Sequence, residues 1–130
     1  MTAPLPPHRQ PKWVEVARSR SAVVRLPAGE TVMAKGETGR VMYVILSGDI
    51  RIRVGDLADE VRSAGDIVGE MALLDEPVRS ADAVAETDVE LVQIDTQLFL
   101  RMVADDPSFG LFIMNALSQR LRRLTRVVDA

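Results

Sequence analysis

The stretch RVMYVILSGDIRIRV, residues 40–54, decides the fold. Its first half is apolar at consecutive positions, which is typical of a strand that is buried on both faces. Its second half alternates strictly between apolar and charged residues. Because neighbouring side chains of a strand point to opposite faces, Ile50, Ile52 and Val54 should face one way. Arg51 and Arg53 should then face the other way. Two such strands in succession predict a β-rich domain.

Similar strand patterns lie on both sides of this stretch, and turn residues separate them. A Pro/Gly turn, PAGE, follows the first pattern, and KGETG follows the second. Many short strands at close, regular spacing favour a sandwich, roll or barrel over a parallel α/β fold. The segments are AVVRL (22–26), ETVMA (30–34), EVRSAG (60–65, entered through a Gly55-Asp56 hairpin turn), SADAVAE (80–86) and DVELVQID (88–95).

The period changes after residue 95, where helices are expected. Asp95 or Thr96 suits the N-cap of a first helix, and Pro107 suits the first turn of a second, longer helix that runs to about 128. A further short helix is expected over KWVEVARS, residues 12–19, with Trp13 and either Val16 or Ala17 docking on the core. The fold class is therefore mainly β with C-terminal helices. We expect a β-roll over about 22–94, helices over about 96–128, and a flexible, proline-rich lead-in over 1–11.

Composition excludes several functions. The 130 residues suit one domain, and the net charge of −3 gives no overall attraction for nucleic acid or an anionic membrane. The chain has no cysteine, and His8 is its only histidine, so neither a Cys- or His-based metal site nor a Ser-His-Asp hydrolase is expected. No signal peptide is visible, and the longest apolar run, VMYVIL, is too short to span a bilayer. We expect a cytoplasmic protein that is not an enzyme and has no metal site.

The chemistry is concentrated in VGEMALLDEPVRSA, residues 68–81. Gly69 permits a tight turn, and Glu70 then begins a short helical segment whose first amides have no internal partners. A carboxylate such as that of Glu70 accepts hydrogen bonds from sugar hydroxyls. The planar guanidinium of Arg79 is suited to phosphate, with the free amides of 71, 72 and 81 beside it. In the competing interpretation, Glu70 and Arg79 pair with each other and Gly69 is only a turn residue. Spacing alone favours that plainer interpretation, because short motifs often match by chance.

A resemblance reverses this preference. The stretch is similar to the phosphate-binding cassette of the cyclic nucleotide-binding domain family, in which Gly-Glu-(Leu/Met)-Ala-Leu-Leu is followed by Arg-(Ser/Thr/Ala)-Ala. LPAGETVMAKGETGRVMYVILSGDIRI (26–52) resembles the first strands of that family, and NALSQRLRRLT (115–125) resembles the helix after its roll. The similarity runs from about residue 22 to the end. It implies a jelly-roll-like double-stranded β-helix and a cyclic nucleotide-binding domain over 12–130.

The resemblance also implies a ligand and roles for single residues. The ligand would be cAMP, or less favourably cGMP, since a hydroxyl at 80 suits both. Glu70 would bind the ribose 2′-hydroxyl, and Arg79 would bind the cyclic phosphate. The residues implied at the binding site are Gly69, Glu70, Met71, Ala72, Arg79, Ser80 and Ala81.

Four positions depart from the family pattern and put affinity in doubt. Val68 replaces an aromatic residue, Pro77 comes one residue early, and Val78 stands where proline is common. Asp82 replaces a frequent Thr or Val and would repel phosphate if it faced the ligand. Strand alternation predicts that it points away.

The long C-terminal helix has two interpretations. Its apolar stripe either packs on the roll, which is favoured, or forms a homodimer seam. The four arginines of this helix, Arg120, Arg122, Arg123 and Arg126, are expected mainly on a solvated face. By the resemblance, one of them, or Leu121 or Leu124, would cover the base. The stripe consists of Met114, Leu117, Leu121, Leu124 and Val128.

We therefore expect a regulatory sensor that binds a cyclic nucleotide and signals to a downstream protein through movement of its C-terminal helices. The chain ends near Ala130, before a helix-turn-helix would fit, so we expect no DNA binding by this chain alone. The alternative is a protein-interaction or dimerisation domain of the same fold that no longer binds nucleotide.

Overall fold

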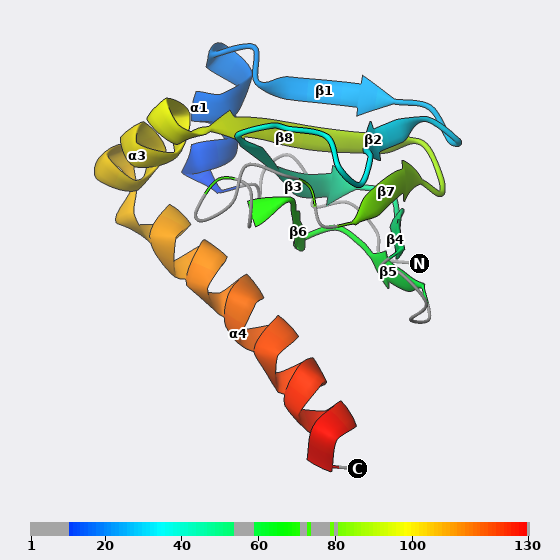
Figure 1. The fold of residues 1–130 in the computed structure, drawn as a ribbon. Coiled ribbons are helices and arrows are strands. Elements are labelled where there is room, and N and C mark those ends of the chain that lie inside the picture. The colour runs from blue at the N-terminus through cyan, green and yellow to red at the C-terminus, as the bar shows by residue number, and fades with distance from the viewer. Residues whose placement is uncertain (1–10, 54–58, 71–72, 74–78, 80, 130) are drawn as a thin grey trace.

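The computed structural model describes residues 11–53, 59–70, 73, 79 and 81–129, with side chains described as far as Arg123 (Figure 1). Within these ranges a short helix is followed by eight strands and then by two longer helices. None of the described helices is both long enough and apolar enough to cross a membrane. The elements are α1 (Lys12–Ser19), β1 (Val23–Leu26), β2 (Thr31–Met33), β3 (Val41–Ser47), β4 (Ile50–Arg53), β5 (Glu60–Arg62), β6 (Ile67–Val68), β7 (Asp82–Ala85), β8 (Val89–Asp95), α3 (Thr96–Asp105) and α4 (Pro107–Asp129).

The strands form two four-stranded antiparallel sheets. Sheet A has the order β1-β8-β3-β6, and sheet B has the order β2-β7-β4-β5. In each sheet, strands from the first part of the chain pair with strands from the last part: Val44 lies opposite Val92 in sheet A, and Ile52 lies opposite Ala83 in sheet B. The chain thus winds back and forth between two layers, which is the jelly-roll-like arrangement that the family resemblance implies.

β3 is buried on both of its faces, as its consecutive apolar residues predict. Met42 and Val44 pack into the cluster beneath the helices. Ile45 packs into the second cluster, between the two sheets, with Tyr43 at its margin. Sheet A is therefore the middle layer of the molecule, between the helices and sheet B. A strand in that position must be apolar on both sides.

β4 shows the alternation that its sequence predicts. Ile50 and Ile52 are buried between the sheets, whereas Arg51 and Arg53 point to the outer face of sheet B. β4 pairs with β5 in the expected antiparallel hairpin. The expected turn at Gly55-Asp56, and Val54 before it, lie outside the described residues.

The helices cover the outer face of sheet A with an aromatic cluster. The ring of Trp13 from α1 lies 5.2 Å from that of Phe109 and 5.1 Å from that of Phe112, both on α4 (centroid distances). Tilted pairs at such distances are favourable beyond the area that they bury. Ala17 and Val14 of α1 are also fully buried, which confirms a docked helix at 12–19. Residues 1–10 of the predicted lead-in lie outside the described residues.

The two C-terminal helices begin where the sequence predicts. Asp95 is the N-cap of α3, and its Oδ1 accepts a hydrogen bond of 2.8 Å from the amide of Leu98. Pro107 is the first residue of α4, where a missing backbone N–H costs nothing. In Figure 1, α4 runs from the sheets out to the C-terminus.

Two features differ from the sequence expectations. β6 has only two residues and is not recognisable by alternation; it exists because Ile67 and Val68 pair with β3. On α4, the favoured packing of the whole apolar stripe on the roll is wrong, since Met114 and Leu121 are 59% and 65% exposed. Leu117 packs against the core, and the side chains of Leu124 and Val128 lie outside the described part. The face that packs on the roll is instead Phe109, Ile113 and Ala116.

Candidate functional site

The candidate site begins at the end of β6. Val68 is fully buried between the sheets, so a residue smaller than the usual aromatic still fills this position. Gly69 follows with a φ of 79°, a conformation that favours glycine. Glu70 and Leu73 then have helical backbone, and Leu73 packs into the cluster beneath the helices. The turn at Gly69 thus directs the chain out of sheet A and places Glu70 at a helical start.

Arg79 is held by backbone contacts from two distant segments. Its amide donates to the carbonyl of Glu37 at 2.8 Å, and its own carbonyl accepts from the amide of Gly36 at 3.0 Å. Its Nη1 donates to the carbonyl of Gly69 at 3.2 Å. The residue is only 6% exposed. Both its backbone and its side chain are therefore fixed, and the guanidinium lies beside the Gly69 turn.

The charge of Arg79 has no carboxylate partner among the residues that the structure describes. Burying a cation without a counterion costs several kcal/mol, so such an arrangement favours the binding of an anion. Its charge also acts on the phenol of Tyr43. Burial raises the pKa of Tyr43, the charge of Arg79 works to lower it, and Glu37 raises it further.

Glu70 is also buried, at 4% exposure, but its partner comes from α4. Nη1 of Arg120 donates to its Oε1, and Nη2 of Arg120 donates to the carbonyl of Ile67 at 2.8 Å. Asp66 lies 3.6 Å from the same Nη2. Arg120 thus connects the long helix to both ends of the Ile67–Glu70 segment.

The surroundings of Arg120 are crowded with charges. Its pKa is lowered chiefly by burial and also by the charge of Arg62, while Asp66 and Glu60 oppose the shift. Its Nε is buried and is the one side-chain polar atom recorded without a hydrogen-bond partner among the described residues. This arginine is therefore partly buried and bound to the roll, and the expectation of a solvated face is wrong for it. Arg122 and Arg123 are exposed, as expected, and the side chain of Arg126 is not described.

In the structure, Arg79 contacts the carbonyl of Gly69, the residue that precedes Glu70. Ala81 follows as a buried residue between the sheets, at 4% exposure. Met71, Ala72 and Ser80 lie outside the described residues. The plainer alternative, in which Glu70 and Arg79 pair with each other, is not what the structure has: Glu70 pairs with Arg120, and Arg79 bonds to the backbone.

Sequence reasoning did not single out Arg120 as the partner of Glu70. A signal was present, because Phe109, Ile113, Ala116 and Arg120 follow one another at spacings of four, three and four on the buried face of α4. Residues at these spacings share one side of a helix. The apolar stripe that starts at Met114 predicts a neighbouring face of the helix instead.

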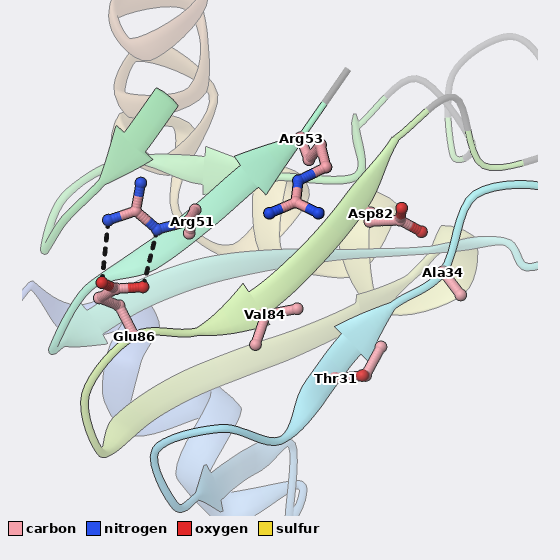
Figure 2. A pocket seen from close by; sticks show the side chains of 7 residues that line it. All are labelled: Thr31, Ala34, Arg51, Arg53, Asp82, Val84 and Glu86. Carbon is pink, nitrogen blue, oxygen red and sulfur yellow. Dashed lines mark hydrogen bonds and ion pairs between the residues drawn. The ribbon is translucent and has the colours of Figure 1, made fainter. Parts of the chain in front are cut away.

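A separate hollow of about 290 Å³ lies on the outer face of sheet B (Figure 2). Asp82 and Glu86 face it together with Arg51, whose guanidinium donates to both carboxylate oxygens of Glu86 at 2.8 and 2.9 Å. Asp82 therefore points to the outer face of sheet B and away from the roll interior, as strand alternation predicts. This hollow is not the predicted site.

Comparison with known proteins agrees with the fold. The family model for the cyclic nucleotide-binding domain matches residues 23–106, which include the whole Gly69–Ala81 segment. The Cyclic AMP receptor protein of Thermus thermophilus is 31% identical over 124 residues, which cover 92% of this chain and 57% of that protein. The chain spans just over half the length of such curated relatives.

Two solved structures share the architecture. The catabolite activator protein of Thermus thermophilus matches with a TM-score of 0.70 and 30% identity, over 93% of this chain and 59% of that one. A second solved structure, described as "A cyclic-GMP-dependent signalling pathway regulates bacterial phytopathogenesis", matches with a TM-score of 0.64 and 28% identity. The match covers 92% of this chain and 95% of that one.

Proposed function

This chain belongs to the cyclic nucleotide-binding domain family, and from that premise we propose that it binds a cyclic nucleotide, cAMP in preference to cGMP, as a regulatory sensor. The observation that carries the proposal is Arg79: a buried guanidinium that has no carboxylate partner among the described residues and lies beside the turn at Gly69. A cyclic phosphate supplies the missing negative charge. Charge-assisted hydrogen bonds of this kind contribute about 1.5–3 kcal/mol each.

Glu70 is the proposed acceptor for the ribose 2′-hydroxyl. It lies one residue after the Gly69 carbonyl that Arg79 contacts, so a compact ligand with a phosphate and a hydroxyl can engage both side chains. The proposed contacts at Met71, Ala72, Ser80 and Ala81 complete the set that the sequence suggests, through amides and the serine hydroxyl.

The preference for cAMP is supported by the relative named as a cyclic AMP receptor. It is opposed by the structural match whose title concerns cyclic GMP. Both purine rings fit the same phosphate and ribose contacts, so the base must be decided by direct competition.

Signalling would run through Arg120. Since Glu70 is bound to Arg120 of α4, a ribose hydroxyl that bonds to the same carboxylate must share or displace this contact. Either change alters what holds α4 to the roll. A ligand shifts such an equilibrium only by the difference in its affinity for the two helix positions.

We also propose that α4 takes part in a homodimer, in which the partner is a second copy of this chain. Leu111 and Met114 are 65% and 59% exposed on a helix whose other face packs on the roll. Exposed aliphatic residues at this spacing suit a helix–helix seam. The alternative function, an interaction domain without nucleotide binding, draws support from the same Glu70–Arg120 pair, which satisfies the carboxylate without a ligand.

Calorimetric titration with cAMP and cGMP tests the proposal. We expect binding of both, tighter for cAMP. Arg79→Leu should weaken binding by about 2 kcal/mol or more, which is roughly 30-fold, because it removes the phosphate partner. Arg25→Leu is the matched control, since Arg25 is an exposed arginine on β1 whose contact is Glu90.

If neither nucleotide gives a heat of binding, the proposed sensor function is refuted and the interaction domain remains. Binding that Arg79→Leu does not weaken would refute the assigned role of Arg79. Thermal shift offers an independent check, because a ligand that binds only the native state raises its melting temperature.

A further inference from the structure

We infer that the loop of residues 34–39, which we call the glycine loop, positions Arg79 for the phosphate, and that Gly39 sets how far its guanidinium reaches. This inference rests on the proposed function and deepens it. The loop lies between β2 and β3, and Gly39 precedes Arg79 by 40 residues in the chain. Neither the position of Gly39 in the sequence nor its type indicates such a role.

Backbone contacts between the loop and Arg79 run in both directions. The carbonyl of Glu37 accepts from the amide of Arg79, and the amide of Gly36 donates to the carbonyl of Arg79, at 2.8 and 3.0 Å. Two bonds that flank one residue fix the position of its backbone. The Cα of Arg79 is therefore placed by the glycine loop.

The guanidinium itself lies between two glycines. A Cβ at Gly39 would lie 3.1 Å from Nη2, 3.4 Å from Nε and 3.5 Å from Cζ of Arg79. A Cβ at Gly69 would lie 2.7 Å from Nη1. The Arg79 side chain thus fits between these two positions only because neither residue has a side chain. Gly39 limits it on one side and Gly69 on the other.

The glycine loop is itself held in place. The amide of Ala34 donates to Oε1 of Glu37 at 2.6 Å, and the amide of Lys35 donates to Oδ1 of Asp82 at 2.7 Å. Asp82, the residue that departs from the family pattern, therefore ties the loop to β7 from the outer face of sheet B. These bonds fix the loop as far as Glu37, so a side chain added at Gly39 would act on the guanidinium that it meets.

Gly39 offers a clean test because its φ does not lie in the left-handed region, unlike that of Gly36 and Gly69. Larger residues are compatible with its backbone. Gly39→Ala requires the guanidinium to shift by a few tenths of an ångström, so we expect less than about a threefold loss of cAMP affinity. Gly39→Val adds two methyl groups against the guanidinium, and we expect a loss of about tenfold or more. The melting temperature without nucleotide should change little in either variant.

The control is Gly110→Ala on α4, where a Cβ would meet only Val103 Cγ1 at 3.8 Å, an ordinary contact. It should leave cAMP affinity unchanged. A double-mutant cycle separates positioning from general damage: in an Arg79→Lys background, which keeps the charge but loses the planar fork, Gly39→Val should change affinity by less than about twofold.

The outcomes are distinguishable. If Gly39→Val binds cAMP as tightly as the wild type, or weakens binding equally in both backgrounds, the inference is wrong although the sensor function stands. If the wild type binds neither cAMP nor cGMP, the proposed function fails. The side-chain Nε–H resonance of Arg79 in an NMR spectrum then still decides the positioning: Gly39→Val must shift it, and Gly110→Ala must not. An unshifted resonance in Gly39→Val overturns the inference.

Discussion

The charge of buried Arg79 acts on the pKa of Tyr43, a partly buried residue at the margin of the cluster between the sheets. Burial has the largest effect on Tyr43 and raises its pKa, because an ionised phenolate is poorly solvated there. The nearby guanidinium of Arg79 opposes this shift and Glu37 adds to it. Tyr43 therefore reports on the same charge that the phosphate is proposed to neutralise.

Titration of Tyr43 by ultraviolet absorbance checks this electrostatic picture, since it is the only tyrosine of the chain. In the native state its midpoint should lie above the ordinary value of 10.0, and in denaturant it should return to that value. The folded state thus holds this proton more tightly. The contribution to stability is fully present below pH 10.0 and is lost as pH rises through the raised pKa.

Saturation with cAMP should raise the pKa of Tyr43 further, because the phosphate offsets the lowering effect of Arg79. Arg79→Leu should give a similar rise without nucleotide. A native midpoint at or below the denatured one would contradict the burial of the phenol.

At the scale of elements, the boundary between β8 and α3 depends on one carboxylate. Asp95 ends the strand and caps the helix through its bond to the amide of Leu98. Asp95→Ala leaves that amide without its partner, and we expect a loss of about 1 kcal/mol in the free energy of unfolding, measured by urea denaturation. Asp95→Asn keeps a side-chain oxygen and should retain most of the stability. Equal losses in both variants would mean that the charge, and not the cap, matters.

The strands differ in how far their own sequences specify them. β3 and β4 are predictable because burial on two faces and on one face leave different patterns in the chain. β6 is two residues long, so its pairing with β3 determines it. The same holds for the buried face of α4, which is selected by the aromatic cluster around Trp13 and not by the most regular apolar stripe.

For the whole molecule, the question is whether nucleotide binding at the site changes the position of α4. Trp13, the only tryptophan, packs against Phe109 and Phe112 of that helix, so its fluorescence reports on the position of α4. We expect cAMP to change the emission of Trp13, and we expect Arg120→Leu to reduce this change. Arg123→Leu is the matched control, because Arg123 is an exposed arginine one turn further along α4 that contacts Asp66.

Binding detected by heat without any change in Trp13 emission would contradict signalling through the helix while leaving nucleotide binding intact. An equal reduction by Arg120→Leu and Arg123→Leu would mean that the Glu70 contact has no special part in the coupling.

The sequence by itself determined the mainly β roll, the helices after it, and the pair Glu70 and Arg79 nine residues apart. These follow from local patterns: strand alternation, turn and cap residues, and a short motif. Only the tertiary structure decided that Arg120 holds Glu70, that the loop of residues 34–39 holds Arg79, and that Gly39 limits its guanidinium. The physical reason is that these contacts join segments about 40 to 50 residues apart, and their distances exist only once both sheets and α4 are packed.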